Sequence, residues 1–310
     1  MNRTTFINLL VVFFLILNVT TWAQQDPQYT HYMYNMSVIN PAYTLDDDEV
    51  LQLGVMHRNQ WTGVNGAPVT NVFFAHGAVS DKIDLGVSIT NDQIGKAVKE
   101  NNIYADFAYS INVNKRTNLS FGLKTGVTLF DVDFANFQLE DPSDFGIAFQ
   151  NRNETFFNMG AGLYLNNRNY YIGLSAPNMI RATHTTSSNG QYKGVEEVHW
   201  YATGGYVLQL NASFKLKPAV MMKAVKGAPL SVDFTLNALY NDRFEVGIAY
   251  RTEDALSALM SIGITNNLKF GYAYDYTLSN LGNYSSGSHE VFLLYDVFLG
   301  ATKYKSPRYF

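Results

Sequence analysis

Apolar side chains alternate with small or polar ones over most of the chain after residue 50. In the stretch 102–113, Ile103, Phe107 and Ile111 occupy one phase, while Asp106 and Ser110 occupy the other. Successive side chains of a strand point to opposite faces, so this stretch is predicted to be a strand with one apolar and one polar face. The alternation recurs in about fourteen segments, at 51–61, 69–79, 84–91, 102–113, 119–129, 156–166, 170–176, 199–210, 214–224, 230–240, 243–251, 256–265, 268–278 and 290–299.

The connections between these segments are of two kinds. Short turns are predicted at 80–82, 114–118, 166–169, 211–213, 241–242 and 266–267. The intervening connections are mostly longer, at 59–68, 92–101, 131–154, 177–198 and 279–288, although 226–229 and 252–255 are brief. Transmembrane barrels show this asymmetry, with short periplasmic turns and longer outside loops. The alternative is a soluble β-sandwich or barrel in which the apolar face forms a core.

Strand length and charge favour the membrane barrel. Ten residues that rise about 3.3 Å each and tilt near 45° span roughly 23 Å, close to an apolar band of about 25 Å. A packed soluble core would bury the charges of the polar phase at a cost of several kcal/mol each. Those charges are Asp106, Lys124, Lys215, Lys217, Lys223, Asp233, Glu245, Lys269, Asp275 and Asp296. The sequence therefore predicts an all-β protein, a transmembrane antiparallel up-and-down β-barrel of about 14 strands.

The first residues have the features of a secretory signal peptide. Arg3 supplies a basic start, an apolar run follows over 6–17, and Ala23 ends a small-x-small cleavage site. We predict a signal peptide over 1–23, a periplasmic or plug segment over 24–48, the barrel over 49–299 and a periplasmic tail over 300–310. An even number of strands with short periplasmic turns places both mature termini in the periplasm.

Composition removes several other classes of protein. The formal charge is −4 and no long Lys/Arg run occurs, so nucleic acid is not an expected partner. The absence of cysteine excludes disulfides, thiolate catalysis and Cys-ligated metal. The exported part of the chain, about 287 of the 310 residues, must then be held by its own core or by a bilayer.

Candidate catalytic motifs are weak. Gly160-Ala161-Gly162 lies inside an alternating strand with no helix after it, so a dinucleotide site is not predicted, and the glycines fit a crowded lumen wall better. The six histidines are scattered, and no serine lies in a nucleophile elbow. The acidic run 46–49 lacks the spacing of a calcium loop. We therefore predict no enzymatic activity, no metal and no cofactor.

The stretch 25–43 differs from the strands, because it is rich in aromatic and amide side chains and does not alternate. Together with Arg58-Asn59-Gln60-Trp61, Gly66-Ala67-Pro68 and the terminal 306–310, it resembles the PorP/SprF family of outer-membrane proteins of the Bacteroidetes type IX secretion and gliding motility system. Thr44-Leu45 departs from the Ala-Gly that often follows Asn-Pro-Ala-Tyr in the family. The residues that carry the resemblance are Gln28, Tyr29, Tyr32, Asn40, Pro41, Tyr43, Gly66, Ala67, Pro68, Pro307, Arg308 and Phe310.

The resemblance implies a non-enzymatic barrel that binds and anchors, or helps to export, a type IX secreted surface protein such as a gliding adhesin with its own C-terminal domain. Type IX secretion components and outer-membrane lipid are the other expected partners. A passive diffusion porin is the alternative, against which a plug over 25–43 and lumen side chains such as Phe292 and Leu294 argue. Candidate partner-binding residues are Arg58, Trp61, Phe134, Phe137, Phe145, Phe149, Met179, Ile180 and Tyr192, because exposed apolar loop residues mark interaction surfaces.

Overall fold

The structure is a computed structural model, and it describes residues 27–45, 49–133, 152–181, 183–186, 193–195 and 197–299. The main strands are β1 (Val50–Asn59), β2 (Pro68–Ser80), β3 (Ile83–Ile94), β4 (Val98–Asn114), β5 (Thr117–Val132), β6 (Arg152–Asn166), β7 (Tyr170–Ala176), β10 (His199–Tyr206), β12 (Phe214–Val225), β13 (Ser231–Tyr240), β14 (Phe244–Arg251), β15 (Ala255–Gly263), β16 (Leu268–Thr277) and β17 (Ser288–Phe298).

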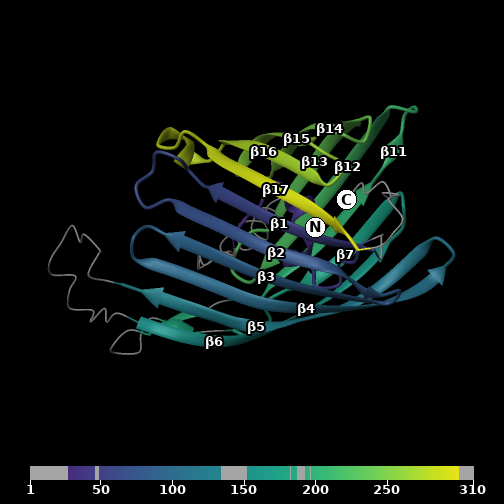
Figure 1. Ribbon diagram of the computed structural model, residues 1–310. Helices are drawn as coiled ribbons and strands as arrows, with labels where there is room; N and C mark the ends of the chain where they lie inside the picture. The colour runs from purple at the N-terminus through teal and green to yellow at the C-terminus, as the bar shows by residue number, and fades with distance from the viewer. Residues whose placement is uncertain are drawn as a thin grey trace, which may run out of the picture.

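These fourteen strands form one closed antiparallel barrel, as the sequence predicted (Figure 1). Each strand pairs with its neighbour in the chain, β1 pairs with β17, and β10 pairs with both β7 and β12. The short β11 (Leu208–Gln209) pairs with β12, while β8 (Thr183–Thr186) and β9 (Lys193–Val195) form a separate hairpin. The described helical pieces are η1 (Tyr32–Tyr34), α2 (Met36–Ile39) and η4 (Asn280–Asn283). No helix of the described chain is long and apolar enough to cross a membrane.

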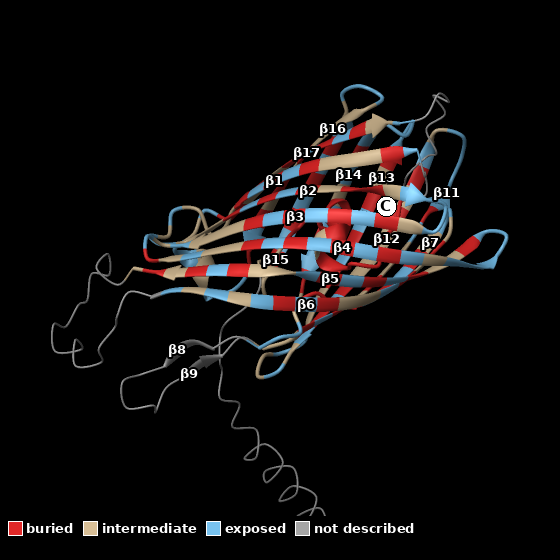
Figure 2. Ribbon diagram, turned by 60° about the horizontal axis from the view of Figure 1, so that its bottom comes forward, coloured by how far each residue is buried: buried red, intermediate tan, exposed pale blue. Residues whose placement is uncertain are grey.

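The two faces of the wall divide as the alternation predicts. Ile103, Phe107 and Ile111 of β4 are 40–44% exposed on the outside, whereas Tyr104 and Asp106 between them are buried inside. Bands of exposed and buried residues alternate along the strands in Figure 2. The large exposed apolar side chains thus cover the outer wall, where a lipid bilayer removes them from water.

A row of polar side chains crosses the outer face of four strands at one level. His57 Nδ1 lies 2.8 Å from Asn71 Oδ1, the Asn71 amide donates to Asn91 Oδ1 at 3.4 Å, and the Asn91 amide donates to Asn101 Oδ1 at 2.7 Å. The outward positions of β4 from Ile103 on have no charge until the turn after Asn114, a span of about 23 Å for a strand tilted near 45°. The polar row therefore marks one edge of the apolar band.

One predicted loop is wrong. A long connection was expected over 92–101, but β3 continues to Ile94 and β4 begins at Val98, so the two strands meet in a turn at Gly95 with φ 63°. Asn91 pairs with Asn101 and Asp92 with Glu100 in this extension. Beyond the apolar band the outward side chains are polar, so the strand pairing continues without the apolar alternation that signals it.

Candidate functional site

Residues 27–45, called the plug segment below, fill the lumen. Tyr32, Asn35 and Met36 are at most 2% exposed, and the segment forms one apolar cluster with wall residues that include Phe74 and Phe292. The Tyr34 and Phe292 rings lie 4.7 Å apart between their centroids. The lumen predicted from the sequence to be filled is thus occupied by the chain itself.

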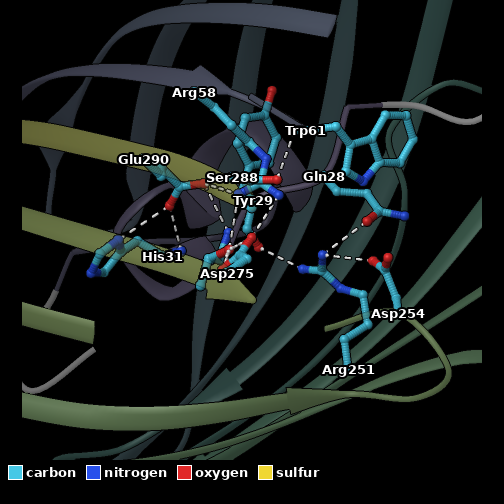
Figure 3. Close-up of polar contacts among 12 residues, drawn as sticks. Gln28, Tyr29, His31, Arg58, Trp61, Arg251, Asp254, Asp275, Ser288 and Glu290 are labelled. Carbon is cyan, nitrogen blue, oxygen red and sulfur yellow. Dashed lines mark hydrogen bonds and ion pairs between the residues drawn. The ribbon is translucent and has the colours of Figure 1, made fainter. Parts of the chain in front are cut away.

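Arg58 of β1 forms the centre of an ion-pair network at one end of the lumen (Figure 3). Its Nη2 lies 2.7 Å from Asp275 Oδ2 on β16, and its Nη1 lies 3.2 Å from Glu290 Oε2 on β17. Nη1 also donates to the Thr30 hydroxyl at 3.0 Å, and that hydroxyl donates to Asp275 at 2.8 Å. One guanidinium therefore joins two strands to the plug segment.

Glu290 binds the backbone of the plug segment. Its two carboxylate oxygens accept the Thr30 N–H at 2.9 Å and the His31 N–H at 2.6 Å. The His31 Nδ1 lies 3.2 Å from the same carboxylate. Because Glu290 is 1% exposed, its charge depends on these donors and on Arg58 for stabilisation.

Arg251, at the end of β14, extends the network to the residues before Thr30. It donates from Nε to Asp233 Oδ1 at 2.7 Å and from Nη1 to Gln28 Oε1 at 2.9 Å. The Asp254 carboxylate lies 3.3 Å from Nη1. Gln28 in the plug segment and Asp254 are thereby bound to one cation (Figure 3), which also binds Asp233 on the wall.

A second charged group holds the plug segment deeper in the lumen. The Tyr34 hydroxyl donates to Glu245 Oε1 at 2.9 Å, and Lys217 Nζ lies 2.9 Å from Glu245 Oε2. Lys269 Nζ lies 4.7 Å from the centroid of the Tyr34 ring.

On the opposite wall the plug segment packs against glycines. A Cβ atom at Gly122 of β5 would lie 2.1 Å from the Ala42 nitrogen, and one at Gly162 of β6 would lie 2.1 Å from Asn40 Oδ1. The Asn40 amide donates to the Leu163 carbonyl at 3.0 Å. The assignment of Gly160-Ala161-Gly162 to a crowded lumen wall is thus confirmed at Gly162.

The two ends of the described chain lie at opposite ends of the barrel. Pro27 and Gln28 lie among Lys223, Ser231 and Arg251. These residues are near the brief connections 226–229 and 252–255, at the end of the barrel that also carries the longer connections. Leu299 follows β17 at the end with the short turns, where its N–H donates to the Glu49 carbonyl. The described part of the chain before β1 therefore runs through the lumen from one end of the barrel to the other. The prediction that both mature termini lie in the periplasm concerns residues outside the described ranges and stays a prediction.

The structure separates the two predicted candidates of the first connection. Arg58 is 2% exposed and points into the lumen, so it contributes to the interior. Trp61 lies in the β1–β2 connection with φ 47°, and its backbone N–H donates to the Ser288 hydroxyl at 3.0 Å. The Thr62 N–H donates to the Gly287 carbonyl at 2.7 Å, which joins this connection to the one before β17.

The other candidates are distributed differently. Met179 and Ile180, 42% and 38% exposed, follow β7. Phe134, Phe137, Phe145, Phe149 and Tyr192 lie outside the described residues, as do Pro307, Arg308 and Phe310. Gly66, Ala67 and Pro68 lead from the first connection into β2. The family-motif residues that lie in the plug segment are Gln28, Tyr29, Tyr32, Asn40, Pro41 and Tyr43.

Sequence reasoning identified the inward charges but not all of their partners. In the structure Lys217 pairs with Glu245, Asp233 with Arg251 and Lys215 with Asp242. Glu290 was missed, although it shares the phase of Phe292, which was assigned to the lumen. Among the described residues, no group of three or more His, Asp or Glu side chains is arranged to hold a metal ion.

A closed barrel with an apolar outer band and inward-facing charges defines an outer-membrane β-barrel protein. Residues 21–295 match the family described as type IX secretion system membrane protein PorP/SprF, and the chain belongs to that family. This confirms the resemblance seen in the sequence. No curated protein matches the chain.

Solved structures share the fold at low identity. A FadL homologue of Pseudomonas aeruginosa is 13% identical with a TM-score of 0.51, over 91% of this chain and 96% of that chain. A mutant of TodX, a monoaromatic hydrocarbon channel, is 10% identical with a TM-score of 0.50, over 85% of this chain and 94% of that chain. These similarities concern the barrel alone.

Proposed function

We propose that this barrel is a non-enzymatic docking protein of the outer membrane. It holds a type IX secreted surface protein, such as a gliding adhesin, at its outer face or assists its export. Membership of the type IX secretion family supports the secretion role. The family alone does not distinguish docking from conduction, so the preference for docking rests on the lumen.

The observation that carries the proposal is the filled lumen. A solute that crossed the barrel would have to displace the plug segment, which is bound by Arg58, Glu290 and Arg251 on one wall and packed on Gly122 and Gly162 on the other. Each of these contacts involves groups that are costly to leave unpaired or unpacked. A barrel closed in this way suits binding at its rim better than passive diffusion.

The longer connections lie at the end that we assign to the cell exterior, and the end of β17 faces the periplasm. Short turns at one end and longer connections at the other are the usual arrangement in outer-membrane barrels. Type IX components and lipid of the outer membrane are the partners that this placement brings within reach.

The outer rim offers apolar side chains for docking. In the connection before β17, Tyr284 is 77% exposed and Leu278 is 49% exposed. Hydrogen bonds through Thr62 join this connection to the one that carries Trp61. With Met179 and Ile180, these residues form the described part of the docking surface, to which the predicted Phe134, Phe137, Phe145, Phe149 and Tyr192 add from the two longest connections.

Surface retention tests this proposal. A fluorescent protein fused to the C-terminal domain of a type IX secreted adhesin serves as the probe in cells that carry barrel variants. Replacement of 134–151 by a short Gly-Ser linker, or of Met179 and Ile180 by serine, should leave a folded barrel and lower the retained fluorescence.

Leu210→Ser is the matched control, since Leu210 is 62% exposed at the opposite end. Retention equal to that of the control in both rim variants would contradict docking at this rim. A steady ion conductance of the unaltered protein would favour the porin alternative instead.

A further inference from the structure

Two short turns lie next to each other at the end of the barrel opposite the longer connections. The β4–β5 turn carries Lys115 and Arg116, and the β6–β7 turn carries Arg168. The turns are neighbours because β5 pairs with β6 from one end of its length to the other. All three cations line one hollow of about 900 Å³, which is large enough for a small polar group.

The hollow is positively charged. Lys115, Arg116 and Arg168 are exposed, and none of them forms an ion pair with a residue that the structure describes. The chain as a whole has a formal charge of −4, so the cluster is a local excess of positive charge. The other residues that line the hollow are neutral, namely Asn118, Asn167, Asn169, Tyr170 and Tyr206. The hollow therefore favours an anion, and two guanidinium groups suit a phosphate in particular.

Both turns are fixed by side-chain hydrogen bonds to their own backbone. Asn114 Oδ1 accepts the Arg116 backbone N–H at 2.9 Å, and Asn167 Oδ1 accepts the Asn169 backbone N–H at 2.7 Å. The Asn169 carbonyl in turn accepts the Val207 N–H at 2.6 Å, which joins the β6–β7 turn to the chain after β10. The backbone that carries the cations is thus held in place before any ligand binds, which lowers the cost of ordering the site.

The hollow lies at one edge of the apolar band. Ile111 and Val113, 40% and 56% exposed, are outward apolar residues of β4 just before Lys115. The row of polar side chains on the outer wall marks the other edge, about 23 Å away along a strand tilted near 45°. Tyr170 of β7 lies opposite Tyr206 of β10, and Tyr206 is 44% exposed. Tyrosines at this level are typical of the interface between acyl chains and headgroups, so the cations lie where lipid headgroups lie.

We propose that the hollow binds the anionic headgroup of a phospholipid, whose phosphate contacts Lys115, Arg116 and Arg168. The acyl chains of that lipid would lie on the outer wall below, where Ile172 of β7 is 58% exposed. A soluble anion would meet the same charges but would not use this apolar surface. The inference requires a barrel that spans a bilayer and does not rest on the docking of a secreted protein. With the short turns in the periplasm, the lipid belongs to the periplasmic leaflet.

Native mass spectrometry of the full chain in uncharged detergent micelles measures this binding. The protein is titrated with dimyristoyl phosphatidylglycerol and, separately, with phosphatidylcholine of the same acyl chains, which has no net charge. The test variant replaces all three cations of the hollow by glutamine. The matched control removes the same charge from exposed lysines at the opposite end of the barrel, through Lys96→Gln, Lys99→Gln and Lys226→Gln.

We expect the first phosphatidylglycerol to bind at least about tenfold more tightly than phosphatidylcholine, and the test variant to lose at least about tenfold in that affinity, as for surface cations that each attract an anionic headgroup. The control should stay within about twofold of the unaltered protein, as should Arg116→Lys with Arg168→Lys, which keeps the charge. If the triple glutamine variant does not fold, Arg168→Gln alone replaces it, with an expected loss of at least about threefold. Equal affinities of the glutamine variant and the control would overturn the proposal.

Competitors distinguish the lipid from other anions. Inorganic phosphate and a glutamate-rich decapeptide are added in turn to the complex with phosphatidylglycerol. We expect the lipid to remain bound, because its acyl chains contribute contacts that neither competitor makes. Displacement of the lipid at equimolar phosphate would assign the hollow to a soluble anion, and displacement at equimolar peptide would assign it to an acidic protein segment. Either result would overturn the lipid site and leave docking at the outer rim unaffected, since retention of the adhesin-domain probe is measured separately.

Discussion

The two walls that hold the plug segment use different physical means. The wall of β1, β14, β16 and β17 presents buried ions, with Arg58, Asp275 and Glu290 each at most 2% exposed. The wall of β5 and β6 presents glycines, against which Asn40 and Ala42 pack at distances that no Cβ would permit. One wall binds the plug segment through ion pairs and hydrogen bonds, and the other through close packing.

Ion pairs and glycines contribute differently to closing the lumen with the plug segment in one register. Ion pairs and backbone hydrogen bonds specify which residue lies opposite which, because a shift would leave buried charges unpaired. Glycines allow the backbone to approach closely, but by themselves they do not select a sequence. Charge therefore fixes the position of the segment along the lumen, and the glycine wall removes the remaining space.

A substitution in the glycine wall should have the largest effect on folding. Gly122→Val would place side-chain atoms within about 2 Å of the Pro41–Ala42 backbone, so either the segment leaves its place or the barrel does not close. We expect loss of the folded, heat-modifiable band on gels of unboiled samples. Gly204→Ala is the control, because its nearest neighbour would be 3.7 Å away. Equal folded yields of the two variants would contradict the close packing of this wall.

Removal of the central cation should be the next largest effect. Arg58→Met leaves Asp275 and Glu290 buried without their guanidinium, and we expect a loss of about 3–5 kcal/mol, less where water enters. Urea unfolding in detergent micelles measures it. The exposed Arg168→Met, in the β6–β7 turn, should change stability by at most about 0.5 kcal/mol and is the matched control. Similar urea midpoints of unfolding for both variants would show that the ion-pair network does not stabilise the barrel.

A single hydrogen bond of the plug segment should have a smaller effect. Tyr34→Phe keeps the ring on Phe292 but deletes the donor to Glu245, which should cost about 1.5–3 kcal/mol, the usual range for bonds to charged groups. The same unfolding assay compares it with Tyr250→Phe, whose ring is 44% exposed on the outer wall. If the two variants unfold at the same urea concentration, the hydrogen bond from Tyr34 to Glu245 does not stabilise the barrel.

A substitution at the outer rim should reduce docking without changing the stability of the barrel. Tyr284→Ala removes a side chain that is 77% exposed, so unfolding should shift by no more than about 0.5 kcal/mol. Retention of the adhesin-domain probe should nevertheless fall by about fivefold, as for an interface residue worth roughly 1 kcal/mol. Tyr240→Ala, at the opposite end of the barrel, should leave retention unchanged. A similar loss in both variants would point to a general defect rather than docking.

The strands could be predicted because each crosses a boundary between lipid and lumen that imposes a period of two. Ile103 to Ile111 carry that period, and the fourteen segments appear in the structure at nearly the expected places. The extension of β3 and β4 at Gly95 could not be predicted in the same way, since its outward residues are polar.

The plug segment was identifiable by composition, but its partners were not. Asp275 was assigned inward by phase, whereas its pairing with Arg58 depends on the register between β1 and β17 and on the placement of Thr30. Arg58 lies within the predicted strand segment 51–61, but its place next to Trp61 led to its assignment to partner binding rather than to the lumen. Contacts between segments more than two hundred residues apart leave no local pattern.

We infer that the plug segment closes the barrel to ions and solutes. Purified protein in a planar lipid bilayer tests it most directly, by comparison of the unaltered chain with a variant that lacks residues 27–45 and regains a folded barrel on gels. We expect no steady open conductance for the unaltered protein and a sustained open channel for the deletion variant. Equal, sustained conductance of both proteins would contradict it.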